Sequence, residues 1–396
     1  AAGSLYHDAA FIGGGFRRSL VLKWVGGNKF PVDFLELVLE HVHFDEMWKS
    51  VDVHEHADNV DYPILHMGGW YDIFLMGNIR AFQAVQENGA EGARGRQHLV
   101  VGPWTHQGWC GLTGTKQGQL VYPQNSKYNM MQKMMPWFVE TVMHVDRGFR
   151  DGPAVEYYTM GDTNDPKAPG NTWRTAESWP PPSEPVRYYF HPGGGLSTDR
   201  PAGGENLELE ADPADPVPTV GGANLVMKAG PCDQREIEKR DDVLVFTSDP
   251  LEEPLEVTGP LTAILFISTD VPDTDFAVRL TDVYPDGRSM LVADGLVRAS
   301  HREGSSHFAP PLEKGKTYEL EVDVTATSIV FNRGHRIRVS IAGSNFPRFD
   351  INLHNGKFFD HGEGEIRNAV ESGLGQYVKE PDLAPDSVTA HSTIYT

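Results

Sequence analysis

Cysteine is almost absent from this chain, which has only Cys110 and Cys232 among its 396 residues. Two cysteines cannot form a disulfide framework, so the fold must rely on hydrophobic cores, for which a chain of this length has ample material. The sequence also lacks an apolar run long enough to cross a membrane. We therefore expect a soluble protein without a membrane partner, located either in the cytoplasm or outside the cell.

Basic residues are in the minority. The chain has 34 lysines and arginines against 55 aspartates and glutamates, a formal net charge of −21. Such a charge argues against binding to nucleic acid, which is itself a polyanion. The acidic residues are spread along the chain rather than gathered in a block, which is typical of a solvated surface and not of an acidic tail.

Signals for a cofactor or a metal are weak. The glycines at 13–15 are not followed by the Gly-Lys-Ser/Thr of a phosphate loop, so a turn is favoured there. His54 and His56 would share one face of a strand, as some zinc ligands do, but no third ligand is evident. We predict no cofactor and no metal site.

A strand–helix–strand pattern occupies the stretch from Pro63 to Gln107. Two short apolar runs, bounded by Gly and Pro, indicate buried strands at its two ends. Between them Ile79, Phe82 and Val85 recur at helical spacing. This pattern predicts a β-α-β unit, whose two strands are parallel neighbours in one sheet.

Asp72 and His106 each follow the carboxyl end of one of these strands, the edge at which open α/β sheets carry their sites. In α/β-hydrolases the triad order along the chain is Ser, then Asp or Glu, then His. The acid orients the imidazole, and the histidine takes the proton of the serine. From spacing alone, an equally open alternative is that Asp72 caps a helix and His106 lies in a polar loop.

Longer motifs around both residues resemble a known family. The strings GGWYDIF (68–74) and VVGPWTHQ (100–107) resemble the acid and histidine motifs of the cocaine-esterase and X-prolyl dipeptidyl-peptidase family of serine hydrolases. Residues 230–235, 242–248, 334–340 and 344–349 are similar to the carboxyl-terminal domain of that family. The resemblance covers most of the chain and implies that Asp72 is the triad acid and His106 the triad base.

One motif of that family has no counterpart. The resemblance implies a nucleophilic serine in a G-x-S-x-G elbow before the acid, and no such pattern occurs in this sequence. Too few residues precede Asp72 to hold the early strands, the elbow and a cap. We therefore expect the serine on a missing segment or on a partner chain. The alternative is a catalytically incomplete chain that acts as a binding or scaffold module for carbohydrate or protein.

Aromatic residues surround the predicted catalytic pair. Because pockets are mostly apolar with a few polar groups, we predict substrate-binding roles for five of them, with packing as the alternative: Phe74, Trp70, Tyr71, Trp104 and Trp109. Phe74 matches a family position that lines the acyl site. Related α-amino-acid ester hydrolases carry carboxylates directly after the acid, and Ile73 and Phe74 stand there instead. The expected substrate is thus a small ester, amide or peptide with an uncharged or apolar acyl group.

Residue patterns along the chain predict three parts with an α/β plus all-β fold. The resemblance implies that residues 1–58 are the end of a helical cap and that 59–182 are the carboxyl-terminal half of an α/β-hydrolase sheet. After the Pro-rich linker at 179–183, short alternating runs predict a sandwich over 183–396. The resemblance implies that it is a jelly roll of galactose-binding-like type.

Three further expectations concern particular segments. An amphipathic helix over 130–145 should place its apolar residues Met134, Met135, Phe138 and Val142 in a core. Residues 201–222, rich in Pro, Gly and Glu, should form a long loop or a partly disordered insert. The exposed edge of a partial sheet also predicts a partner chain or a homo-oligomer.

Overall fold

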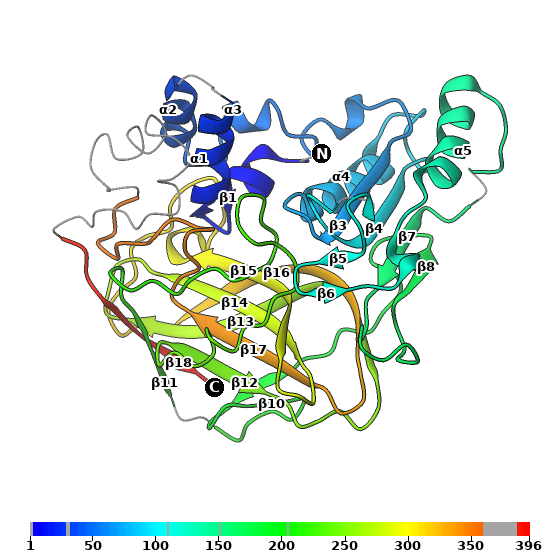
Figure 1. Cartoon of the computed structure of the whole chain (residues 1–396). Helices are drawn as coiled ribbons and strands as arrows, with labels where there is room; N and C mark the ends of the chain where they lie inside the picture. Colours follow the sequence, from blue (N-terminus) through cyan, green and yellow to red (C-terminus); the bar gives the residue numbers. More distant parts are fainter. Residues whose placement is uncertain (1–2, 29–31, 109–110, 150–151, 204–205, 359–385) are drawn as a thin grey trace.

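The computed structural model describes residues 3–28, 32–108, 111–149, 152–203, 206–358 and 386–396. It contains an α/β sheet, a β-sandwich and an amino-terminal helical segment that lies beside both (Figure 1). The predicted fold class, a partial α/β sheet followed by a sandwich, is confirmed. Within the described residues, no helix has the length and apolar character that crossing a membrane requires.

The α/β sheet has four strands in the order β3-β4-β7-β8. Its members are β3 (Leu65–Tyr71), β4 (His98–Thr105), β7 (Val155–Thr159) and β8 (Thr172–Ala176). The first three run parallel, and β8 pairs antiparallel with β7. Among the described residues, no strand pairs with the other side of β3, so this strand is a free edge of the sheet.

Helix α4 (Leu75–Asn88) joins β3 to β4 and completes the predicted β-α-β unit. Its residues Ile79, Phe82 and Val85 are buried, as their helical spacing indicates. The helix ends at Gly89, whose N–H donates to the carbonyl of Val85. The two parallel strands therefore end at the same edge of the sheet.

A bulge interrupts the pairing of β3 with β4. The strands pair in register up to Gly69 and Gly102, and then the pairing moves to Tyr71 with Thr105. A Cβ atom on Gly69 would lie 2.1 Å from the carbonyl oxygen of Trp104, so only glycine allows this close approach. Bulges redirect the chain that follows them, and here Asp72 follows on one strand and His106 on the other.

The sandwich consists of two sheets. One has six strands in the order β15-β14-β17-β12-β10-β9, and the other has four in the order β11-β18-β13-β16. The strands are β9 (Tyr189–His191), β10 (Gly195–Ser197), β11 (Leu207–Ala211), β12 (Val243–Thr247), β13 (Leu255–Thr269), β14 (Asp275–Val283), β15 (Ser289–Arg298), β16 (Tyr318–Phe331), β17 (Arg336–Ala342) and β18 (Ala390–Tyr395). Residues 285–287 form the turn between β14 and β15, where Pro-Asp-Gly predicts one.

One hydrophobic core runs from the α/β sheet into the sandwich. Trp70 and Tyr158 belong to it on one side, and Phe276 and Phe331 on the other. Trp179 lies between β8 and β9, and its ring packs on that of Trp70 with centroids 5.4 Å apart. The predicted linker is therefore held in place by a buried side chain, and it connects the two parts closely.

The amino-terminal segment is mostly helical. It contains the π-helix η1 (Tyr6–Ala10), the short strands β1 (Phe11–Ile12) and β2 (Gly15–Phe16), and helices α1 (Arg18–Gly27), α2 (Val32–Glu40) and α3 (Glu46–Lys49). Tyr6, Phe11, Phe16 and Trp48 share a separate core beneath these helices. That this segment is the end of a cap stays a prediction.

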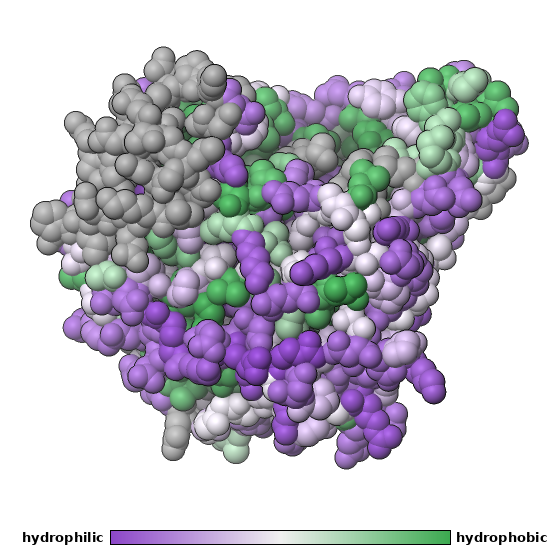
Figure 2. Space-filling view, viewed as in Figure 1, coloured by the Kyte–Doolittle hydropathy of each residue, from purple (hydrophilic) through white to green (hydrophobic). Residues whose placement is uncertain are grey.

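Helix α5 (Met130–Met143) corrects one expectation. The helix forms where it is predicted, but Met135, Phe138 and Val142 are 40%, 46% and 54% exposed. Figure 2 shows this apolar surface at the upper right, where Figure 1 places α5. The expected core role is wrong for these three residues, because α5 meets the sheet on one side only, through Met134 and the Lys133–Glu156 ion pair.

A second correction concerns residues 201–222. They do not form a loop throughout, because β11 pairs with β18 over five residues. The remaining short elements are η2 (Ala57–Asn59), β5 (Lys116–Gln117), β6 (Leu120–Val121), η4 (Gln124–Ser126) and η5 (Ala299–His301).

The bulge gives a direct test of this packing. Gly69→Ala should lower the free energy of unfolding by about 1–3 kcal/mol, the usual cost of overpacking. Gly68→Ala on the same strand is the matched control, because the nearest atom to its added Cβ would be 3.4 Å away. Urea unfolding of both variants measures the difference, and equal midpoints would contradict the account.

Candidate active site

The structure brings Asp72 and His106 into contact. The Nδ1 atom of His106 lies 3.1 Å from Oδ1 and 3.2 Å from Oδ2 of Asp72. A carboxylate only accepts hydrogen bonds, so Nδ1 carries the proton and donates it. Oδ1 also accepts the backbone N–H of Phe74 at 2.8 Å, and the N–H of Asp72 donates to the carbonyl of Gly69. The turn between β3 and α4 therefore holds the carboxylate in place.

The acid of the pair is buried and the imidazole is partly exposed, an arrangement that suits acid–base chemistry at His106. The Asp72 side chain is 6% exposed, whereas that of His106 is 38% exposed. The hydrogen bond to Asp72 raises the pKa of His106 above its usual 6.5, and partial burial opposes this rise. Among the described residues, Nε2 of His106 has no hydrogen-bond partner, so it is available to a reacting group.

A groove opens beside this pair along the free edge of β3. Its volume is about 570 Å³, within the size range of ligand pockets. Phe74 lines it beside His106, with ring centroids 5.5 Å apart and planes at 86°. Further lining comes from β3, α4, α5 and the amino-terminal segment, through residues that include Met67, Asn78, Met134 and Val53.

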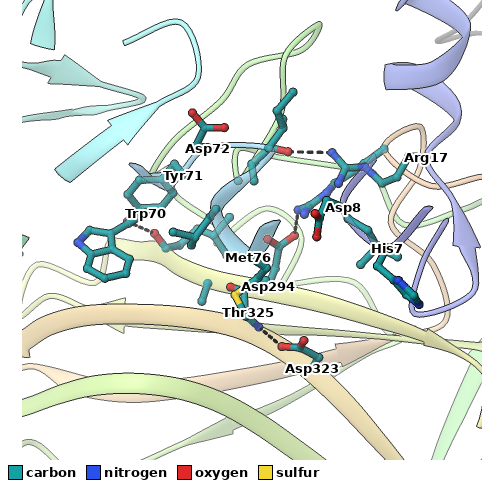
Figure 3. A pocket seen from close by; sticks show the side chains of 18 of the residues that line it. His7, Asp8, Arg17, Trp70, Tyr71, Asp72, Met76, Asp294, Asp323 and Thr325 are labelled. Atoms are coloured by element: carbon teal, nitrogen blue, oxygen red, sulfur yellow. Dashed lines mark hydrogen bonds and ion pairs between the residues drawn. The ribbon is translucent and has the colours of Figure 1, made fainter. Parts of the chain in front are cut away.

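The other predicted substrate-binding residues lie elsewhere. Trp70 and Tyr71 are buried and donate to the carbonyls of Tyr158 and Leu291. They line a second, smaller cavity on the other side of Asp72 (Figure 3). Trp104 is 1% exposed and donates to the carbonyl of Ser126, so its contacts are those of a core residue. Trp109 lies outside the described residues, and substrate contacts by these four stay predictions.

No complete triad is present within the described residues. Several histidines contact a serine hydroxyl and others contact a carboxylate, but none of those described forms hydrogen bonds to both. Cys110 lies outside this part of the chain. His54 bonds to Asp52, and no group of three metal-ligating side chains occurs among the described residues.

Sequence reasoning missed the charged lining of the smaller cavity, where Arg17, Asp294 and Arg348 meet. Arg17 lies between Phe16 and the buried face of α1. A charged residue in this apolar setting is the sequence feature that could have indicated a buried arginine. Its partners could not be found in the same way, because they lie some 280 and 330 residues further along the chain.

Comparisons with known proteins show which family the chain is similar to. The sequence model of the X-Pro dipeptidyl-peptidase family S15 matches residues 4–108, and that of the X-Pro dipeptidyl-peptidase carboxyl-terminal non-catalytic domain matches 147–374. Cocaine esterase from Rhodococcus sp. (strain MB1 Bresler) is 35% identical over 337 residues, which are 81% of this chain and 55% of the esterase. A relative from Mycobacterium bovis is 28% identical over 73% of this chain and 46% of its own length.

Solved structures share the fold. An aminopeptidase from a marine sediment archaeon of the Thaumarchaeota has a TM-score of 0.80 at 23% identity, covering all of this chain and 68% of its own. An α-amino acid ester hydrolase has a TM-score of 0.75 at 24% identity, covering 96% of this chain and 61% of its own. At these identities the likeness concerns the fold alone.

The α/β sheet followed by a β-sandwich, together with these sequence matches, places the chain in a family of hydrolases. The chain belongs to the family of X-Pro dipeptidyl-peptidases and cocaine esterase. It spans about half the length of the curated relatives that it matches.

Titration of His106 tests the pair. NMR of the imidazole should give a pKa above 6.5, because the Asp72 carboxylate favours the charged ring. Asp72→Asn should lower that pKa below 6.5, because burial then acts without compensation. Asp45→Asn, which removes the carboxylate bonded to His41, is the control and should leave His106 unchanged. An unshifted His106 titration in the Asp72 variant would disprove the coupling.

Proposed function

We propose that this chain supplies the acid and the base of a serine hydrolase that cleaves ester or amide bonds through an acyl-enzyme. The observation that carries the proposal is the contact of His106 Nδ1 with both oxygens of the buried Asp72, which leaves Nε2 directed to reactants. The nucleophilic serine is proposed to come from polypeptide outside these 396 residues, because no G-x-S-x-G elbow occurs within them.

The chemistry follows from the two nitrogens of His106. Nε2 takes the hydroxyl proton of the serine as the oxygen attacks the carbonyl carbon of the substrate. Asp72 stabilises the imidazolium that results, and the imidazolium then protonates the departing alcohol or amine. A water molecule repeats the sequence on the acyl-enzyme, which releases the acid and restores the serine.

The groove supports an uncharged acyl group as the substrate class. Phe74 presents its ring beside the imidazole, and Met67 and Met134 add apolar surface. Directly after Asp72 stand Ile73 and Phe74, so no carboxylate is placed there to bind a substrate ammonium group. Small esters and amides with apolar acyl groups fit this lining, and an X-Pro dipeptide is the peptide alternative.

We propose that the polypeptide carrying the missing serine pairs with the free edge of β3. A strand added in parallel to β3 would end at the same edge of the sheet as Asp72 and His106. Unpaired strand edges bind other polypeptide readily, and the exposed apolar face of α5 needs covering as well. Either a partner chain or further sequence of the same protein would cover both the edge of β3 and the apolar face of α5.

A binding or scaffold role, for carbohydrate or protein, is the alternative. A chain that has lost catalysis has no need for a carboxylate aligned with an imidazole at the mouth of a groove. The Asp72–His106 geometry therefore favours catalysis over binding alone.

Ester hydrolysis by the 396-residue chain alone tests where the serine lies. With a p-nitrophenyl ester we expect only background turnover, equal in the wild type, in His106→Ala and in the control His391→Ala. His391 also faces a carboxylate but is exposed on β18, far along the chain. Turnover by the wild-type chain that falls about 10³-fold or more in His106→Ala alone would place the nucleophile within these residues instead.

A further inference from the structure

Three buried arginines and one buried aspartate lie near one another behind Asp72. Arg17 comes from the amino-terminal segment, Arg279 from β14 and Arg348 from the loop after β17, and each is at most 2% exposed. Asp294 on β15 pairs with Arg348 and lies opposite Arg279 in the sheet register. The nearby Glu238 is already paired with Arg338 at 2.6 Å, so the group has an excess of positive charge.

Several guanidinium nitrogens in this group have no partner. Arg17 donates through Nη2 to the carbonyl of Ala223 at 3.1 Å, but its Nε and Nη1 have no hydrogen-bond acceptor among the described residues. The same holds for Nε of Arg348 and Nη1 of Arg279. Burying an unpaired charge is costly, and so is burying an unsatisfied donor. Burial and the nearby Arg348 both lower the pKa of Arg17.

The cavity at these groups has room for a small ligand. It measures about 50 Å³, more than the roughly 30 Å³ that one water molecule occupies in the liquid. Arg17, Asp294 and Arg348 line it, and Figure 3 shows the guanidinium of Arg17 directed inward from the amino-terminal segment. At Gly222 an added Cβ would lie 3.1 Å from Nη1 of Arg348, so glycine keeps this space open.

The carboxylates of Asp8 and Asp323 also line the cavity, and Arg80 faces both, at 2.6 Å from Asp323 and 4.0 Å from Asp8. Among the described residues, neither carboxylate forms an ion pair with Arg17 or Arg348, and Asp294 pairs with Arg348. The unpartnered donors of Arg17 and Arg348 therefore need a further anionic acceptor.

We propose that Arg17 and Arg348 bind a small inorganic anion of the size of chloride in this cavity. Guanidinium groups donate charge-assisted hydrogen bonds to anions, and here two of them would face one ligand. Because Arg17 belongs to the amino-terminal segment and Arg348 to the sandwich, the anion links these two parts behind Asp72. The site needs neither the serine nor turnover, so it stands independently of the proposed function.

Crystals of the chain grown with bromide in place of chloride test the site directly. We expect an anomalous difference peak within hydrogen-bond distance of Nε and Nη1 of Arg17 and Nε of Arg348. Ordered water alone at this position would overturn the proposal, and so would a protein carboxylate that occupies it. No variant is needed for this experiment, so it does not depend on a mutant that folds.

Thermal unfolding gives the solution counterpart. At constant ionic strength, chloride replacing gluconate should raise the Tm of the wild type in a saturable way, by about 3 °C. Arg17→Gln should abolish this dependence, whereas Arg187→Gln, at an exposed arginine, should retain it. A Tm that is insensitive to chloride in the wild type, or equally sensitive in Arg17→Gln, would contradict the proposal.

Discussion

The contact between the Asp72 carboxylate and the His106 imidazole is the interaction on which the rest of this structure depends. It requires two parallel strands that end together, a bulge between them and a glycine at position 69 that permits their close approach. The neighbouring side chains anchor this edge to the sandwich, since the Tyr71 hydroxyl donates to a carbonyl of β15. The sandwich therefore supports the acid of the pair from behind.

The same sheet has a free edge on the side that faces the groove. Among the described residues, strand β3 is paired along one edge only, the groove of about 570 Å³ follows its other edge, and α5 exposes an apolar face nearby. These features have one common explanation in the proposed function, which is that further polypeptide covers them and carries the nucleophile.

Sequence reasoning succeeds where local periodicity or a motif determines the structure. The placement of Asp72 and His106 at neighbouring strand ends follows from two strands joined by a helix, whereas their proposed roles come from the resemblance to a family. The turn at 285–287 follows from its Pro-Asp-Gly. It fails where the structure of a segment depends on a partner that is distant in the sequence. Periodicity identifies the apolar face of α5 but not whether anything covers it, and β11 exists because β18, some 180 residues later, pairs with it. The arginine cavity likewise joins three separate segments.

Labelling with a fluorophosphonate probe tests the central claim most directly. The protein would be prepared with every polypeptide that accompanies it in its natural form and then read by denaturing intact-mass spectrometry. The proposed function predicts one covalent adduct, on a serine outside these 396 residues, that is lost in His106→Ala. An adduct on a serine within the 396 residues, or no adduct on any polypeptide, would contradict it.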